Sequence, residues 1–195
     1  MDIYKALKRE KKLHKMFYIT MTSIAIILPL AVFLTGLNTF IYISYLLVIE
    51  FLIGITVLRK TNITKLSYLC NNNRLKIKGG LFGKESLIFC DKVVLVHTEK
   101  MDQEMEIIII TSVNFKNRAL KPVMKSFLKR YPVIRKEYSR IEEKNENSHF
   151  YFQVIRRGEL NKYMLLDVIY KNCVKAVYTE ESIQNIKIAR GQTLA

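Results

Sequence analysis

The chain has 195 residues, half of them hydrophobic, and a formal net charge of +15 at pH 7. Its three cysteines are odd in number and form no Cys-x-x-Cys pair, which argues against a disulfide framework and favours a reducing compartment. Phosphate-loop, His-Glu-x-x-His and Gly-x-Ser-x-Gly motifs are all missing from the sequence. We therefore expect a protein that is not an enzyme and needs no cofactor.

Two apolar runs stand near the start of the chain, at residues 17–34 and 40–58, with only residues 35–39 between them. Each run is long enough to cross a hydrocarbon core of roughly 30 Å as a helix. The first run has no charged residue and the second has only Glu50. The pattern predicts a transmembrane hairpin over residues 17–58.

The charges beside these runs predict their orientation. Residues 1–16 contain six Lys or Arg and residues 59–65 contain three, whereas the turn between the runs contains none. Because short Lys- and Arg-rich loops stay on the cytoplasmic side, both ends of the hairpin should be cytoplasmic, in the inner (plasma) membrane. A cleaved signal peptide is the alternative, but its apolar region is about 7 to 15 residues long and does not lead into a second span.

Short segments rich in β-branched and aromatic residues follow the hairpin and predict strands. We expect strands at residues 66–70, 74–78, 85–90, 93–98 and 106–111, joined by short polar or glycine-containing turns into one antiparallel meander. Within this region Leu75, Ile77 and Leu81 alternate with Lys76, Lys78 and Gly80, a pattern that indicates one buried and one solvated face.

Helical spacing begins after Ser112, with Val123, Phe127 and Ile134 as apolar anchors. Pro132 should separate a first short helix from a second at about 133–144. The polar residues 142–148 suggest a boundary, followed by a strand (150–155), a helix (160–172), a strand (174–178) and a helix (180–190) capped by Thr179. The predicted fold class is an α+β membrane protein with a hairpin, a β domain with basic helices (62–145) and a βαβα segment (149–195).

One part of the chain carries a family resemblance. Residues 73–83 (Asn-Arg-Leu-Lys-Ile-Lys-Gly-Gly-Leu-Phe-Gly) and 87–96 (Leu-Ile-Phe-Cys-Asp-Lys-Val-Val-Leu-Val) form a strand, glycine turn and strand. Over residues 68–111 this arrangement resembles bacterial pleckstrin-homology-like (PH-like) membrane proteins. The resemblance implies a transmembrane hairpin before a small cytoplasmic β barrel that closes with further strands and a C-terminal helix. It implies no catalytic residue.

Glu50 is an acidic residue near the middle of a predicted span. Insertion scales give about 2.5 to 3.5 kcal/mol for an acid at the centre of a span, so such a residue is a functional hypothesis by default. We expect it to hold a partner helix, either another membrane protein or a second copy of this chain. The alternatives are a hydrogen bond inside the hairpin and an ion pathway. The candidates for that hydrogen bond are Thr20, Ser23, Thr39 and Ser44.

The histidines lie in unrelated sequence contexts and indicate no metal site. They are His14, His97 and His149. Asp91 and His97, on adjacent predicted strands, are a conceivable acid–base pair, but a lone strand histidine is more often structural. We therefore expect no catalytic residue among them.

The most distinctive charge feature is a basic tract at residues 116–136 without a single acidic residue. Its members are Lys116, Arg118, Lys121, Lys125, Lys129, Arg130, Arg135 and Lys136. Such a tract can be a solvated face, or it can bind anionic lipid headgroups, an acidic protein or nucleic acid. Tethering by the hairpin gives lipid a high effective concentration, which places the membrane surface first. Nucleic acid comes second, because aromatic residues lie between the charges but no known binding module is present.

Taken together, these patterns favour a membrane scaffold or adaptor whose basic cytoplasmic domain binds a protein partner or anionic lipid. Two alternatives are a membrane component of a DNA-handling, conjugation or secretion apparatus and a small transporter or channel subunit that uses Glu50.

Overall fold

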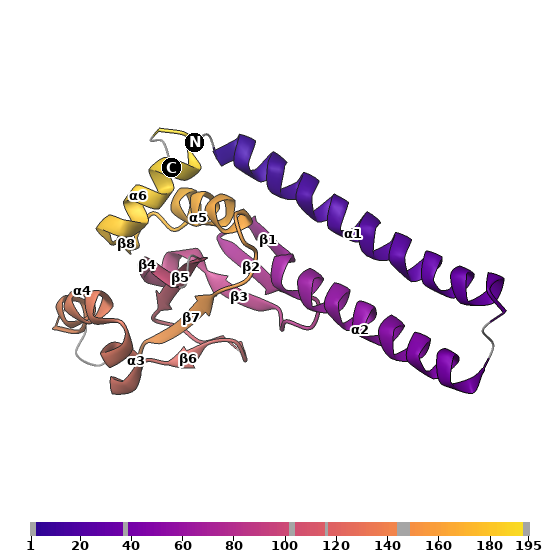
Figure 1. Cartoon of the computed structure of the whole chain (residues 1–195). Coiled ribbons are helices and arrows are strands. Elements are labelled where there is room, and N and C mark those ends of the chain that lie inside the picture. Colours follow the sequence, from indigo (N-terminus) through magenta and orange to yellow (C-terminus); the bar gives the residue numbers. More distant parts are fainter. Residues whose placement is uncertain (1–2, 37–38, 102–103, 116, 144–148, 193–195) are drawn as a thin grey trace.

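The computed structural model describes residues 3–36, 39–101, 104–115, 117–143 and 149–192. The chain is an α+β protein in which two long apolar helices precede two β-sheets and a set of shorter helices (Figure 1). The coarse architecture expected from the sequence is therefore confirmed.

The two long helices are α1 (Ile3–Leu34) and α2 (Phe40–Thr64), which run side by side as a hairpin away from the rest of the chain (Figure 1). Both are long and apolar enough to cross a membrane, and no residue of their most apolar windows is buried within the chain. Near the sheets, Tyr18 Oη and Thr61 Oγ1 share a hydrogen bond of 2.9 Å. The hairpin thus presents an apolar surface that the rest of the protein does not cover.

Helix α1 begins well before its apolar run. Residues 3–16, predicted only as a basic N-terminal segment, continue the helix alongside the sheet domain. Ile3, Ala6 and Leu7 are buried, and their spacing of three and four residues places them on one helix face. We call residues 3–16 the N-terminal extension of α1.

The first sheet contains β1 (Leu66–Asn71), β2 (Arg74–Gly79) and β3 (Ser86–Phe89), all antiparallel. Asn72 and Asn73 form the first turn with φ of 48° and 59°, angles that asparagine tolerates and that suit a two-residue hairpin. Leu75 and Ile77 are buried as predicted. The expected alternation does not continue to Leu81, because β2 ends at Gly79 and the buried residue at that point is Gly80.

The second sheet has the strand order β6-β7-β5-β4-β8. Its strands are β6 (Lys121–Pro122), β7 (Tyr151–Ile155), β5 (Glu104–Thr111), β4 (Val93–Met101) and β8 (Val177–Tyr178). The predicted single five-stranded meander is wrong. A 3-10 turn, η1 (Cys90–Lys92), redirects the chain after β3, and β4 pairs with β5 and, in parallel, with β8 instead.

The basic region folds as α3 (Lys125–Arg130) and α4 (Pro132–Glu143), with Phe127 and Ile134 buried as expected. Pro132 is the first residue of α4, a position where its missing N–H removes no helical hydrogen bond. Two further helices, α5 (Asn161–Asn172) and α6 (Glu180–Ala189), lie near the C-terminus. Thr179 caps α6 as predicted, because its side chain accepts a hydrogen bond from Ser182 N.

Strand β7 lies between β5 and β6, so the segments on the two sides of the polar boundary share one sheet. Residues 144–148 of that boundary lie outside the described residues. The predicted strand at 174–178 is reduced to β8, because the chain first makes a turn in which Ala176 N donates to Cys173 O at 3.2 Å.

The run Ile107–Ile110 explains the two-sided core. All four side chains are buried: Ile107 and Ile109 join the cluster with the first sheet and α5, whereas Ile108 and Ile110 join the cluster under α3 and α4. Because successive side chains of a strand point to opposite faces, an unbroken apolar run is what a strand covered on both faces requires.

The three cysteines gather in the first of these clusters as free thiols. Cys70 Sγ and Cys90 Sγ are 3.8 Å apart, and Cys173 is buried beside them. Burial, together with the neighbouring Cys90 thiol, raises the pKa of Cys70 to about 11. A hydrogen bond with Cys173, together with burial, raises the pKa of Cys90 as well, so the Cys70 and Cys90 thiols stay protonated at neutral pH. All three cysteines fill space in the core.

Candidate functional site

Glu50 lies in the middle of α2 and is partly buried. Within the described chain its Oε1 atom is buried and has no hydrogen-bond partner. Of the hydroxyl groups proposed as partners, that of Ser44 donates instead to Phe40 O of its own helix at 2.8 Å. The hairpin therefore leaves one carboxylate oxygen of Glu50 unsatisfied.

The predicted basic tract is spread over three elements. Lys121 belongs to β6, three members lie on α3 and two on α4, while Lys116 lies outside the described residues. All seven described members are exposed: Arg118, Lys121, Lys125, Lys129, Arg130, Arg135 and Lys136. Figure 1 shows α4 at the end of the domain opposite to the helical hairpin.

Two members of the tract, Lys121 and Arg130, line a hollow of about 460 Å³ together with Arg156. We call this the basic hollow. Phe127 and Phe152, whose rings are stacked at 3.8 Å between centroids, contribute apolar surface to its lining. The hollow thus combines three cationic side chains with apolar ring surface.

A buried carboxylate supports the cationic side of the basic hollow. Glu106 accepts hydrogen bonds from Arg156 Nε at 2.8 Å and from Tyr131 Oη at 3.1 Å. The Arg130 guanidinium lies 5.6 Å from the centroid of the Tyr131 ring, a cation–π distance. Burial is the main cause that raises the pKa of Tyr131, which keeps its hydroxyl a donor at neutral pH. Glu99, which interacts electrostatically with Glu106 and Arg130, is a second acid on this side, and burial raises its pKa. The three cations of the lining outnumber these two acids, so the hollow suits an anionic ligand.

The aromatic residues that alternate with the basic tract belong to the core. Phe127, Tyr131 and Tyr138 are each less than 10 % exposed, and Tyr138 packs edge-on against Phe150. Phe115 is exposed but meets Phe89 edge-on at 5.9 Å. Stacking of these buried rings on nucleic-acid bases would require them to leave the core.

Sequence reasoning missed Arg156, which lies outside the basic tract. The signal was the Arg156-Arg157 pair directly after the predicted strand at 150–155, since side chains at strand ends often line sites. The neighbouring Arg157 has a structural role, because its Nη1 donates hydrogen bonds to Gly79 O at 3.1 Å and to Asn62 Oδ1 at 3.2 Å. It thereby fastens β2 to the end of α2.

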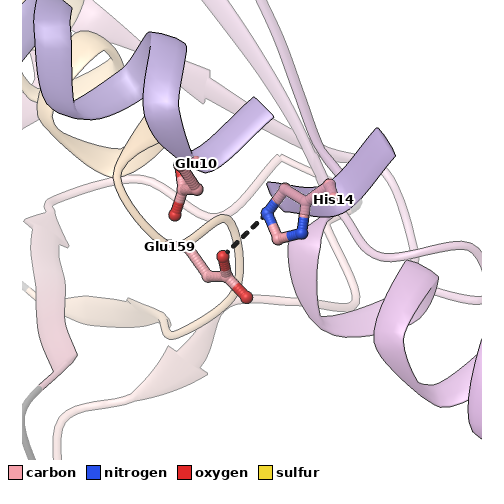
Figure 2. Close-up of side chains that lie close together, drawn as sticks. All are labelled: Glu10, His14 and Glu159. Atoms are coloured by element: carbon pink, nitrogen blue, oxygen red, sulfur yellow. Dashed lines mark ion pairs between the residues drawn. The ribbon is translucent and has the colours of Figure 1, made fainter. Parts of the chain in front are cut away.

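A second grouping, also missed, lies where the hairpin meets the domain. Glu10 and His14 point from the N-terminal extension of α1 toward Glu159, which follows β7 in the chain (Figure 2). His14 Nε2 is 3.0 Å from Glu159 Oε2, and Lys60 Nζ of α2 is 2.9 Å from Glu159 Oε1. We call these four side chains the junction cluster.

The backbone before α5 places Glu159 with little freedom. Gly158 has φ of 110°, and a Cβ atom there would lie 2.5 Å from Leu66 Cδ2, so only glycine fits. Gly158 N donates to Ile63 O at 2.9 Å, and Leu160 N donates to Glu10 Oε1 at 3.3 Å. Residues 156–160 are thus held against both long helices.

Two carboxylates meet in the junction cluster with different proton affinities. Burial, followed by a hydrogen bond with Glu159, raises the pKa of Glu10 to about 7. Burial alone would raise the pKa of Glu159 too, but hydrogen bonds from Glu10 and Lys60 lower it overall. Glu10 is therefore mostly protonated below about pH 7, whereas Glu159 keeps its negative charge.

His97 does not pair with Asp91. Its Nδ1 lies 2.9 Å from Thr179 Oγ1 in a buried position, whereas Asp91 is exposed in the turn η1. Burial lowers the pKa of the His97 imidazole, so the ring is neutral at pH 7. This arrangement favours the structural role over the acid–base pair.

Comparisons of the chain with protein-family models, with curated proteins and with solved structures found no match. The residues and their geometry are therefore the grounds on which a function can be assigned.

Proposed function

We propose that this chain is a non-enzymatic adaptor of the bacterial inner membrane, whose cytoplasmic domain binds an acidic segment of a partner protein. The observation that carries the proposal is the basic hollow, in which Lys121, Arg130 and Arg156 converge from three elements over stacked rings. An acidic segment with an apolar anchor residue matches this combination of charge and surface.

The hairpin is the proposed membrane anchor. Helices α1 and α2 have the length and apolar surface of spans, and basic residues flank both cytoplasmic ends. The resemblance to PH-like membrane proteins is part of the proposal. Two antiparallel sheets followed by the C-terminal helix α6 support it, while the parallel pairing of β8 with β4 is a departure from a closed meander.

The placement of the tract favours a protein partner over the chain's own bilayer. Helix α4, with Arg135 and Lys136, lies at the end of the domain opposite to the hairpin (Figure 1). Cations on that side are farther from headgroups around the spans than the cations at residues 5–15. We therefore place lipid contacts at the hairpin flanks and the protein partner at the basic hollow.

The edge of β7 offers a way to hold an extended segment. Strand β6 pairs only with Tyr151 and Phe152, so the same edge of β7 is not paired with a strand from Gln153 onward in the described chain. Gln153 and Val154 also line the basic hollow. A segment that adds to this edge gains main-chain hydrogen bonds while its acidic side chains reach Arg130 and Arg156.

The unsatisfied oxygen of Glu50 supports an intramembrane contact with another span, from a partner or from a second copy of the chain. A transporter function for Glu50 has less support, because one acid on a two-helix hairpin provides no pathway without further helices. A DNA-handling function has less support, because three of the aromatic residues near the basic tract, Phe127, Tyr131 and Tyr138, are buried. Phe115 is exposed and could stack on a base, while the cations could contact phosphates.

Fluorescence anisotropy with labelled octaglutamate tests the proposal on the full-length protein in detergent micelles. The triple variant Lys121→Ala/Arg130→Ala/Arg156→Ala should bind at least about tenfold more weakly, since charge-assisted hydrogen bonds contribute about 1.5–3 kcal/mol each. The control Lys8→Ala/Lys11→Ala/Lys12→Ala removes the same charge from exposed positions on α1 and should retain binding.

Two results would contradict the proposal. One is equal weakening of octaglutamate binding in both triple variants, which would mean that net charge alone sets the affinity. The other is binding of the unmodified protein to anionic vesicles or labelled DNA, but not to octaglutamate, with loss of that binding in the first triple variant. That outcome would assign the basic hollow to lipid or to nucleic acid.

A further inference from the structure

The proposed adaptor function does not explain why the ionisable side chains of the junction cluster lie together. Glu10, His14 and Glu159 each present one ligand atom, and these three atoms all lie within 4.8 Å of one another. Two carboxylate oxygens and an imidazole nitrogen form a ligand set typical of Zn²⁺ and related divalent transition metals. We propose that these three residues form a binding site for a divalent transition metal of the Zn²⁺ class.

The helix supplies two of the ligands in a suitable spacing. Glu10 and His14 are four residues apart on α1, so they lie on the same helix face one turn from each other. That face continues the buried stripe of Ile3, Ala6 and Leu7, which fixes the rotation of α1 toward the domain. Both side chains therefore face Glu159 across the junction, as Figure 2 shows.

The distances in the cluster fit a shared ion. Ligand bonds of about 2.0–2.2 Å place neighbouring ligand atoms roughly 3–3.5 Å apart. His14 Nε2 and Glu159 Oε2 are already 3.0 Å apart, and Glu10 needs only a side-chain adjustment to bring its oxygen as close. A hollow of about 240 Å³ leaves room for water in the remaining positions, and it is lined by Glu10 and Glu159 and also by Lys100 and Lys162. The buried Lys162 ammonium donates to Arg156 O at 2.7 Å, which directs it toward the backbone.

Lys60 competes with a metal ion for the Glu159 carboxylate, but the two would contact different oxygen atoms. Its ammonium contacts Oε1 of Glu159, whereas Oε2 is the oxygen that faces His14. The ion pair with Lys60 thus leaves Oε2 available as a ligand, so Lys60 affects the site only as a competing positive charge. Because the cluster joins α1 to residues 157–160, a bound ion would fasten the N-terminal extension of α1 to the domain.

Isothermal titration of tag-free, chelator-stripped full-length protein with Zn²⁺ in micelles tests the site. We expect one Zn²⁺ per chain, with affinity at least about 100-fold lower in His14→Ala and in Glu159→Gln. His149→Ala, which removes an exposed histidine elsewhere, should bind as the unmodified chain does. Lys60→Met should bind as tightly or more tightly, since it removes the competing cation.

A second measurement does not depend on variants that fold. Zn²⁺ should raise the urea midpoint of the unmodified chain, and Mg²⁺ at the same concentration should not, because Mg²⁺ prefers an all-oxygen shell. The proposal is overturned if the unmodified chain binds no Zn²⁺, or if His14→Ala and Glu159→Gln fold and bind Zn²⁺ unchanged. Loss of Zn²⁺ binding in Lys60→Met would also overturn it and would identify the cluster as an ion-pair network alone.

Discussion

Replacement of Glu106 by glutamine is expected to change stability and ligand binding in opposite directions. The buried Glu106 carboxylate accepts hydrogen bonds from Arg156 and Tyr131 and is an acidic group next to the basic hollow. Glutamine keeps the shape and one acceptor oxygen, but it removes the charge. The protein should therefore lose part of two hydrogen bonds while the hollow becomes more positive.

The magnitudes follow from these contacts. A hydrogen bond to a charged group contributes about 1.5–3 kcal/mol and a neutral one about 0.5–1.5 kcal/mol, so each of the two bonds weakens by about 1 kcal/mol. The Arg156 side chain is 54 % exposed, which reduces its share, and we expect a total loss of about 1–2 kcal/mol in the free energy of unfolding.

Binding should become tighter for an electrostatic reason. Removing one negative charge about 7 Å from an anionic ligand changes the Coulomb energy by about 0.6 kcal/mol in water and about 2.4 kcal/mol at an effective dielectric constant of 20. For an open hollow we take about 1 kcal/mol, or roughly fivefold tighter binding of octaglutamate at low salt, fading as salt is added.

Urea unfolding followed by circular dichroism and anisotropy with labelled octaglutamate measure the two effects. The matched control is Glu137→Gln on α4, which removes the same charge from a residue that pairs with exposed Arg140. Unchanged or weaker binding by a folded Glu106→Gln variant would refute the assignment of Arg156 to the ligand. Equal tightening in the control would mean that the overall charge, and not the basic hollow, is responsible.

Four further outcomes are expected. Unfolded His97 takes up a proton near pH 6.5, but burial lowers its pKa in the fold, so this residue destabilises the fold as pH drops below about 6.5. The urea-measured stability of the unmodified chain relative to His97→Asn should therefore fall with pH over this range, and a difference that does not depend on pH would contradict this. Gly158→Ala should cost about 2–5 kcal/mol in urea unfolding, because of its positive φ and the overlap with Leu66, and a loss below 1 kcal/mol would be inconsistent. Thr179→Ala should cost about 1–2 kcal/mol through loss of the α6 cap and be detected as a lower thermal midpoint; an unchanged midpoint would argue against the cap. In vesicles, energy transfer between labelled chains or co-purification of a partner should persist in Glu50→Gln and be lost in Glu50→Leu, whereas retention in both would exclude Glu50 as the contact.

The parts of the fold that local pattern determines were predictable. Asn72 and Asn73 mark a two-residue turn, Thr179 marks a helix start, and Pro132 marks a break, each through the backbone angles or hydrogen bonds of a few neighbouring residues. The pairing of β4 with β8 was not predictable in this way, since β8 is two residues long and lies far along the chain. The prediction of a single meander was wrong because short connections favour, but do not require, the pairing of neighbouring strands.

The candidate sites show the same difference between residues that are close in sequence and residues that only the fold brings together. The basic tract was visible because its charges are close in sequence, but only Lys121 and Arg130 of it reach the hollow, and their third partner, Arg156, is brought there by β7. Glu10 and Glu159 are separated by most of the chain, so no local pattern could pair them. The stripe of Ile3, Ala6 and Leu7 was a readable signal that α1 extends beyond its apolar run, although the surrounding lysines obscured it.

The five residues 156–160 connect the two sites. Arg156 lines the basic hollow, Arg157 fastens β2 to α2, and Glu159 meets both long helices in the junction cluster. Gly158 allows the tight turn between them, because Leu66 occupies the space that a Cβ atom at this position would need. The basic hollow and the junction cluster are therefore joined through five consecutive residues, so a substitution at Gly158 is expected to disturb the positions of both Arg156 and Glu159.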